Sequence, residues 1–155
     1  GDFDYAEDAP FNPGTSLGRS LLEPTKIYVK SCLAALETGG VHGLAHITGG
    51  GLLENIPRVL ADGLAATVDV STWPLPPVFG WLAKKGAIAP LELARTFNCG
   101  IGMAVIAADE KADAVERALR DAGEIVFRIG AVTEAADAGD TPAVHLNNME
   151  DAWPP

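Results

Sequence analysis

The sequence predicts an α/β (α+β) fold in which helices cover a mixed sheet, and three observations lead to this expectation. Segments with strand-like composition alternate with segments of helical periodicity along most of the chain. Residues 100–108 are nearly all apolar, which is typical of a strand buried on both faces. Residues 109–123 carry apolar side chains at helical spacing between a capping aspartate and a terminating glycine.

The individual elements follow from the same patterns. Proline marks the start of several segments and glycine marks their ends. The expected helices cover residues 25–38, 52–60, 79–85, 90–95 and 109–122. The expected strands cover residues 41–48, 65–70, 100–108, 125–132 and 143–146. We expect an irregular lead-in at residues 1–16, an α/β domain at 17–147 and a loose tail at 148–155.

Composition restricts the function classes. The chain has 155 residues, enough for one domain with a real core, and 48% of them are hydrophobic. Its formal net charge of −10 argues against a nucleic-acid partner, because phosphate contacts need clustered Lys and Arg. Two cysteines without metal-type spacing predict reduced thiols, and no segment is long and apolar enough to span a membrane. We expect a soluble, cytoplasmic protein with no membrane partner.

The most informative motif is a glycine-rich turn between a predicted strand and a predicted helix. Thr48 is followed by Gly49, Gly50 and Gly51, which allow positive φ angles and close approach of a ligand. Backbone N–H groups in such a turn favour an anion, and Arg58 can reach back to it if the helix is short. The motif is not a P-loop, since no Lys-Ser or Lys-Thr pair follows. The residues alone leave a plain connection equally open.

Histidines, an asparagine and a cysteine are further candidates. His46 adjoins the turn, where it can contact a ligand or act as an acid–base group, whereas His42 and His145 are expected to be structural. His42 and His46 lack the surroundings of a metal-binding helix, so we expect no metal site. Asn98 either binds a ligand or caps a turn, and Cys99 is expected to be buried and inert.

Four segments in order resemble one enzyme family, phosphoribosylformylglycinamidine cyclo-ligase, also called aminoimidazole ribonucleotide synthetase. They are LLEPTKIYVK at 21–30, HGLAHITGGG at 42–51, ENIPRVL at 54–60 and TFNCGIGM at 96–103. Each segment alone has low specificity, but the combination is specific. The resemblance extends over residues 17 to 130 and implies the fold of the carboxy-terminal domain of that superfamily.

The resemblance also implies a reaction in purine biosynthesis. ATP activates the formyl amide oxygen of formylglycinamidine ribonucleotide, and a substrate nitrogen closes the imidazole ring. Family members are usually homodimers, with ATP and Mg²⁺ bound mainly by an amino-terminal domain. By resemblance, Thr48 and Gly49 to Gly51 line the cleft between the domains and hold phosphate, with His46 and Asn98 close by.

The chain departs from this family in length, since full members also contain the ATP-binding half. We therefore expect that the isolated chain cannot close the ring by itself. Two alternatives stay open. One is a non-catalytic anion-binding or dimerisation module. The other is a related ATP-dependent enzyme of the same superfamily, such as selenophosphate synthetase or thiamine-phosphate kinase.

Overall fold

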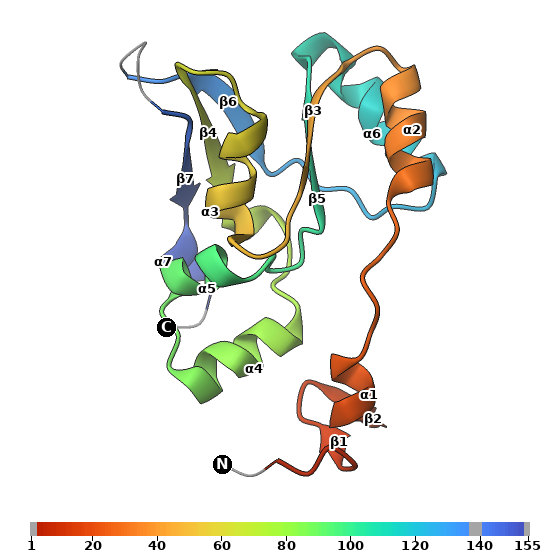
Figure 1. Cartoon of the computed structure of the whole chain (residues 1–155), viewed down its shortest axis with the longest axis vertical. Helices are drawn as coiled ribbons and strands as arrows, with labels where there is room; N and C mark the ends of the chain where they lie inside the picture. The colour runs from red at the N-terminus through yellow and green to blue at the C-terminus, as the bar shows by residue number, and fades with distance from the viewer. Residues whose placement is uncertain (1–2, 137–140, 154–155) are drawn as a thin grey trace.

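The computed structural model describes residues 3–136 and 141–153, and it confirms the predicted mixed α/β class. Within these ranges the strands form three sheets instead of one (Figure 1). Strands β1 (Asp8–Ala9) and β2 (Asn12–Ser16) form an antiparallel pair. Strands β3 (Val41–His46) and β5 (Met103–Ala107) form a second antiparallel pair.

The third sheet is mixed and has the order β6-β4-β7. Its central strand β4 (Leu64–Asp69) pairs antiparallel with β6 (Gly130–Glu134) and parallel with β7 (Ala143–Asn147). The helices of the chain are α1 (Leu17–Leu21), α2 (Val29–Glu37), α3 (Gly51–Asn55), α4 (Pro77–Gly86), α5 (Pro90–Thr96), α6 (Ala112–Asp121) and α7 (Met149–Ala152). None of the helices in the described part of the chain is long and apolar enough to cross a membrane.

Two apolar clusters hold these elements together. The larger one joins α3 and α5 to the β6-β4-β7 sheet, and Leu52, Ile56 and Leu93 are its fully buried large side chains nearest the glycine turn. The smaller one joins α2 to α6 through Ala35, Val115 and others. Burying such aliphatic side chains stabilises a fold by roughly 1.5–3 kcal/mol each. The turn after β3 is therefore fixed to the larger core.

Both chain ends are more ordered than the sequence predicts. The expected irregular lead-in contains the β1–β2 pair, and the rings of Phe3 and Phe11 contact Trp81 of α4 at centroid distances of 5.5 and 5.2 Å. The expected loose tail contains α7, and Trp153 is only 3% exposed because its ring packs edge-on against Trp73. Aromatic contacts of this kind order segments that lack any periodicity.

Several predicted elements are shorter than expected. The helix predicted at 52–60 ends at Asn55, and a separate 3₁₀ turn at Pro57–Val59 follows because proline cannot donate a helical hydrogen bond. The strand predicted at 41–48 ends at His46, where the glycine turn begins. The strand predicted at 125–132 begins only at Gly130, although the carbonyl of Ile129 still accepts from the N–H of Asp69 at 2.8 Å.

The strand predicted at 100–108 was expected to be buried on both faces, and this was wrong. It covers Met103–Ala107, and only Ala104 within it is fully buried. Its other residues are half-buried because they border a groove that is also lined by α6 and β6. The apolar run is therefore not a sign of complete burial in this chain.

Candidate glycine-turn site

The turn between β3 and α3 has the backbone geometry that the three glycines predict. Gly50 has a φ angle of 95° and Gly51 one of 55°, in the left-handed region that side chains disfavour. A Cβ atom at Gly51 would overlap with the carbonyl oxygen of Ala94 on α5. Gly51 is thus required by both its φ angle and its close packing against another helix.

Asn55 holds this turn in shape from the inside. Its side chain is 4% exposed, and its Nδ2 donates to the carbonyl oxygens of Thr48 at 3.3 Å, Gly49 at 3.2 Å and Gly51 at 2.8 Å. Asn55 is the last residue of α3, so it does not cap the start of that helix. Its position between Leu52 and Ile56 on the buried face was the signal that could have revealed this role.

The Asn55 contacts determine where the turn's N–H groups point. In a trans peptide the N–H of one residue points opposite to the carbonyl of the residue before it, and the structure has no cis peptide among its described residues. Because the carbonyls of Thr48 and Gly49 face Asn55, the N–H groups of Gly49 and Gly50 face away from it. Across the part of the chain that is described, no backbone group accepts from either N–H.

Charged side chains flank the turn. The Asn55 Oδ1 accepts from Arg58 Nη1 at 2.9 Å, and Arg58 Nη2 lies 3.8 Å from Glu54 Oε2. The side chain of Glu54 folds back over Gly50. If Gly50 carried a Cβ atom, that atom would lie only 2.7 Å from Oε2 of Glu54. Arg58 therefore reaches back to Glu54 and Asn55 of α3, and Asn55 in turn contacts the glycine turn. An incoming anion would have to displace the Glu54 carboxylate from this position.

His46 lies at the end of β3, exposed, and its ring contacts Tyr28 edge-on at a centroid distance of 5.9 Å. Tyr28 lies in the segment before α2 and covers Gly102, where a Cβ atom would overlap with its hydroxyl. Burial raises the pKa of the Tyr28 phenol, and the nearby Glu124 carboxylate acts in the same direction. Tyr28 is a neighbour of His46 that the sequence did not single out.

Asn98 and Cys99 have structural roles. The Asn98 Oδ1 accepts from the N–H of Gly100 at 3.0 Å, so it caps the turn before β5. Cys99 is fully buried, and burial raises its thiol pKa to about 12, which disfavours the nucleophilic thiolate. Its carbonyl accepts from Trp73 Nε1 at 2.9 Å. The expected inert character of Cys99 agrees with this environment.

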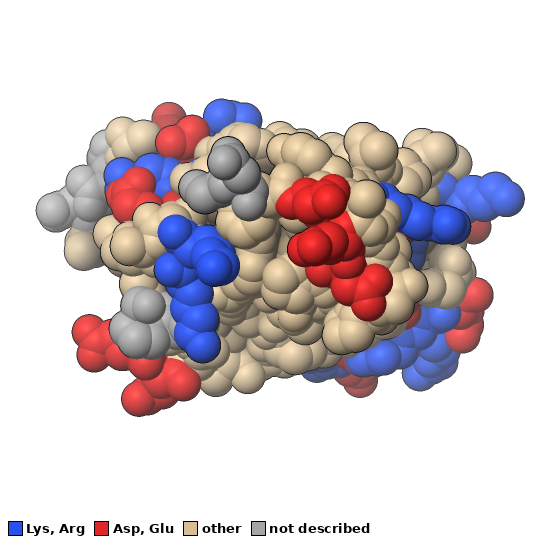
Figure 2. Space-filling model, turned by 90° about the horizontal axis from the view of Figure 1, so that it is seen from below, with Lys and Arg blue, Asp and Glu red and all other residues tan. Residues whose placement is uncertain are grey.

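The other candidates do not gather into a metal site. His42 on β3 and His145 on β7 are both exposed, on different sheets. Among the residues with described positions, no group of three or more His, Cys, Asp or Glu side chains could hold a metal ion. On the face seen in Figure 2, acidic and basic side chains are scattered, with uncharged surface between them.

The four segments that carry the family resemblance meet in space. Asn55 of the third segment donates to three carbonyl oxygens of the glycine turn in the second. Gly51 also packs against the carbonyl oxygens of Ala94 and Phe97, the latter in the fourth segment. Tyr28 of the first segment contacts His46 of the second and Gly102 of the fourth. Segments far apart in sequence therefore form one continuous region around the end of β3.

Comparison with known proteins places this geometry in context. Residues 2–140 match the family model described as AIR synthase related protein, C-terminal domain. A crystal structure of thiamine-monophosphate kinase from Stenotrophomonas maltophilia is similar in fold, with 17% sequence identity and a TM-score of 0.49. The match covers 70% of this chain and 32% of the kinase, so the chain spans about a third of the length of that protein.

Proposed function

The chain belongs to the family of AIR synthase related C-terminal domains, and we propose that it is the substrate-binding part of an ATP-dependent cyclo-ligase. This enzyme would convert formylglycinamidine ribonucleotide to aminoimidazole ribonucleotide in purine biosynthesis. One observation supports the choice of this enzyme within the family: the four segments that resemble the cyclo-ligase converge around the glycine turn.

The turn and its neighbours receive specific roles in this proposal. The N–H groups of Gly49 and Gly50, the Thr48 hydroxyl and the Arg58 guanidinium bind the substrate phosphate. Helix α3 has only five residues, so the local N–H groups contribute more than the helix dipole does. His46 is the proposed acid–base group, because it is exposed and stands two residues before Thr48 in the chain. Asn98 supports the adjoining loop from its capping position.

ATP and Mg²⁺ belong to a different domain in this proposal. The residues described here offer no carboxylate cluster that fits a magnesium ion, so no step of the chemistry is assigned to one on this chain. We place both groups on an amino-terminal ATP-binding domain that closes over the glycine turn. The assembled enzyme is proposed to be a cytoplasmic homodimer, acting without a nucleic-acid or membrane partner.

Calorimetric titration with formylglycinamidine ribonucleotide tests the binding role. We expect saturable binding that is lost in Gly50→Leu, because the new side chain would crowd the turn. Gly123→Leu is the matched control, since Gly123 ends α6 with a φ angle of 92°, close to the 95° of Gly50, and has open space around it. Both variants carry a similar backbone strain, but only the first should lose binding. A folded chain that does not bind the nucleotide would leave only a non-catalytic module.

A second measurement concerns catalysis. The isolated chain, given ATP, Mg²⁺ and formylglycinamidine ribonucleotide, is expected to form no aminoimidazole ribonucleotide, because the proposed ATP site is on another domain. Product formation by this chain alone would contradict the proposal that the ATP site lies on another domain. If the chain binds thiamine monophosphate or a selenium-containing substrate better than formylglycinamidine ribonucleotide, the related ATP-dependent enzymes of the superfamily replace the cyclo-ligase.

A further inference from the structure

Helix α2 exposes an apolar stripe, which consists of Val29, Leu33 and Leu36. These side chains are 61%, 56% and 45% exposed, although the same helix buries Ser31 and Ala35. Their spacing of four and then three residues places them on one face, because an α-helix has 3.6 residues per turn. In Figure 1, α2 lies at the edge of the molecule with α6 as its neighbour. The stripe therefore faces away from the rest of the chain.

The stripe is separate from the apolar regions that hold the fold together. Within the described part of the chain, none of its three side chains joins either apolar cluster, and none lines the groove beside β5. Ile27, just before the helix, is also 82% exposed. Single exposed apolar side chains are common, but a continuous apolar face on one helix is typical of an interaction surface.

Two exposed charges accompany the stripe on α2. Lys30 and Glu37 are seven residues apart, which is nearly two helical turns, so both lie on the same flank of the stripe. Neither side chain forms an ion pair with any residue in the ranges 3–136 and 141–153. The helix thus presents an apolar face together with one cation and one anion that have no partner within those ranges.

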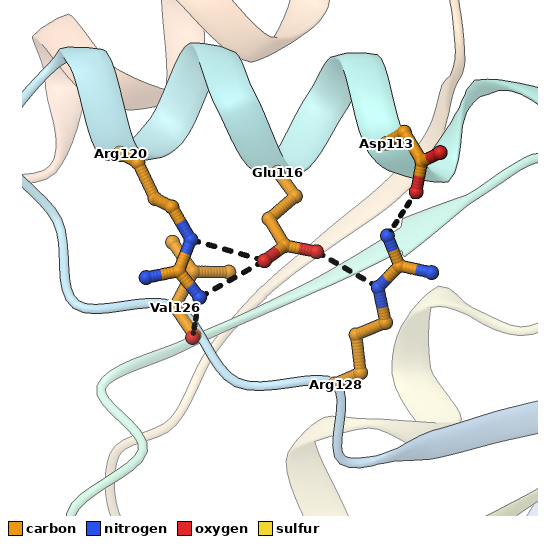
Figure 3. A network of polar contacts seen from close by, with 5 residues as sticks. All are labelled: Asp113, Glu116, Arg120, Val126 and Arg128. Atoms are coloured by element: carbon orange, nitrogen blue, oxygen red, sulfur yellow. Dashed lines mark hydrogen bonds and ion pairs between the residues drawn. The ribbon is translucent and has the colours of Figure 1, made fainter.

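The neighbouring helix α6 has the opposite character, because its charges are paired within the chain (Figure 3). Glu116 accepts from Arg128 at 2.8 Å and pairs with Arg120 at 2.9 Å. Arg128 also contacts Asp113. These charged groups of α6 are therefore already satisfied, and the outer face of α2 is the better candidate for a contact with another molecule.

A second copy of α2, running antiparallel, matches both the apolar and the charged pattern. A twofold axis beside Leu33 places Leu33 opposite its own copy and Val29 opposite Leu36 of the second copy. Lys30 then lies beside Glu37 of the second copy, and the symmetry repeats this ion pair. A parallel arrangement would instead bring Lys30 beside Lys30 and Glu37 beside Glu37, which is repulsive. The face is therefore self-complementary in one orientation only.

We propose that two copies of this chain associate through antiparallel α2 helices. The stripe is buried between them, and two Lys30–Glu37 pairs set the register. The contact goes beyond the proposed function, because it requires neither the nucleotide nor the glycine turn. Helix α2 has only nine residues, so the interface is small and the dissociation constant of the dimer is expected in the micromolar range.

Sedimentation velocity of the chain over a range of concentrations tests the association. We expect a monomer–dimer equilibrium in the native chain. Leu33→Glu should weaken it by roughly tenfold or more, because the substitution brings two carboxylates together at the twofold axis. Leu91→Glu is the matched control, since Leu91 is 43% exposed on a different helix, α5, and should leave the equilibrium unchanged. Circular dichroism verifies that both variants remain folded.

A charge exchange tests the orientation of the helices. Lys30→Glu and Glu37→Lys should each weaken the dimer by roughly fivefold, because each places like charges at both pairs. The chain that carries both substitutions should regain the native affinity, since each pair is then restored with its signs exchanged. Failure of the double variant to recover would rule out the antiparallel register.

Other outcomes would also overturn the proposal. A native chain that stays monomeric at all concentrations would do so, as would a dimer that Leu33→Glu does not weaken. If a longer chain with the proposed ATP-binding domain protects residues 29–37 from hydrogen exchange as a monomer, that domain covers the stripe instead. Leu33→Glu should leave the calorimetric titration with formylglycinamidine ribonucleotide unchanged, so this inference and the proposed function can fail independently.

Discussion

The glycine turn and the groove beside β5 differ in how completely the chain covers its own residues. At the turn, the buried Asn55 amide engages three carbonyl oxygens, and Gly51 packs against α5 without space for a methyl group. At the groove, Ile125 is one of the lining residues and is 81% exposed. The carbonyl side of the turn is therefore fixed by contacts within this chain, whereas Ile125 is not covered by it. Substitutions at Gly51 and Asn55 should be costly, and a substitution at Ile125 should be nearly neutral.

The largest effect is expected at Gly51. Gly51→Ala adds a Cβ that overlaps with the Ala94 carbonyl and places alanine at a φ angle of 55°. Overpacking costs about 1–3 kcal/mol and the left-handed conformation about 1–2 kcal/mol, so we expect a loss of roughly 2–5 kcal/mol. Urea denaturation followed by circular dichroism measures this loss. Gly49→Ala is the control, since its Cβ would meet nothing within 4 Å, and it should stay within about 0.5 kcal/mol of the native chain.

Asn55→Ala is expected to have the next largest effect. It leaves the carbonyls of Thr48 and Gly49 without their buried donor, which costs about 1–3 kcal/mol of unfolding free energy. Because Asn55 also holds Arg58, the variant should in addition weaken the binding of formylglycinamidine ribonucleotide. The same denaturation experiment and a calorimetric titration measure the two losses. A variant that loses stability but binds the nucleotide as the native chain does would separate Asn55 from the proposed phosphate site.

The different behaviour of the two regions explains what sequence could predict. The glycines after β3 predicted the turn because positive φ angles depend mainly on residue type. The role of Asn55 was not predicted, because its three acceptors come from the turn before it and a pattern of apolar spacing does not report side-chain hydrogen bonds. Residues 125–129 have strand composition, yet pairing depends on a neighbour that composition alone does not provide. The ordered ends depended on Trp81 and Trp153, whose contacts lie far away in sequence.

Protonation of Asp113 and Glu116, the carboxylates that pair with Arg128, should change the stability of the chain with little effect on the glycine turn. Hydrogen bonds from Arg128, together with its charge, hold the pKa values of Asp113 and Glu116 below their usual range. A carboxyl whose pKa is lower in the folded chain contributes stability at neutral pH. That contribution is lost as the pH falls through the lowered value. Arg128→Gln should therefore raise both pKa values and reduce the acid-dependent loss of stability.

Carboxyl carbon NMR titration measures this change in the two pKa values directly. Arg95→Gln provides the control, because Arg95 is similarly exposed and pairs with Glu92 within α5. It should leave the titration of Asp113 and Glu116 unchanged. If Arg128→Gln leaves both pKa values in place, Arg128 does not neutralise these carboxylates, and the charges of α6 are no better satisfied than those of α2.

The smallest effect is expected at Ile125, and it distinguishes an uncovered side chain in the groove from a packed one. Ile125→Thr keeps a β-branched side chain at a position that is 81% exposed, so the unfolding free energy should change by less than about 0.5 kcal/mol. Val115→Thr is the contrasting variant, since Val115 is 3% exposed in the cluster between α2 and α6 and its substitution should clearly lower the free energy of unfolding. A marked loss of stability in Ile125→Thr would mean that Ile125 itself packs within this chain, as its neighbours Val126 and Ile129 do.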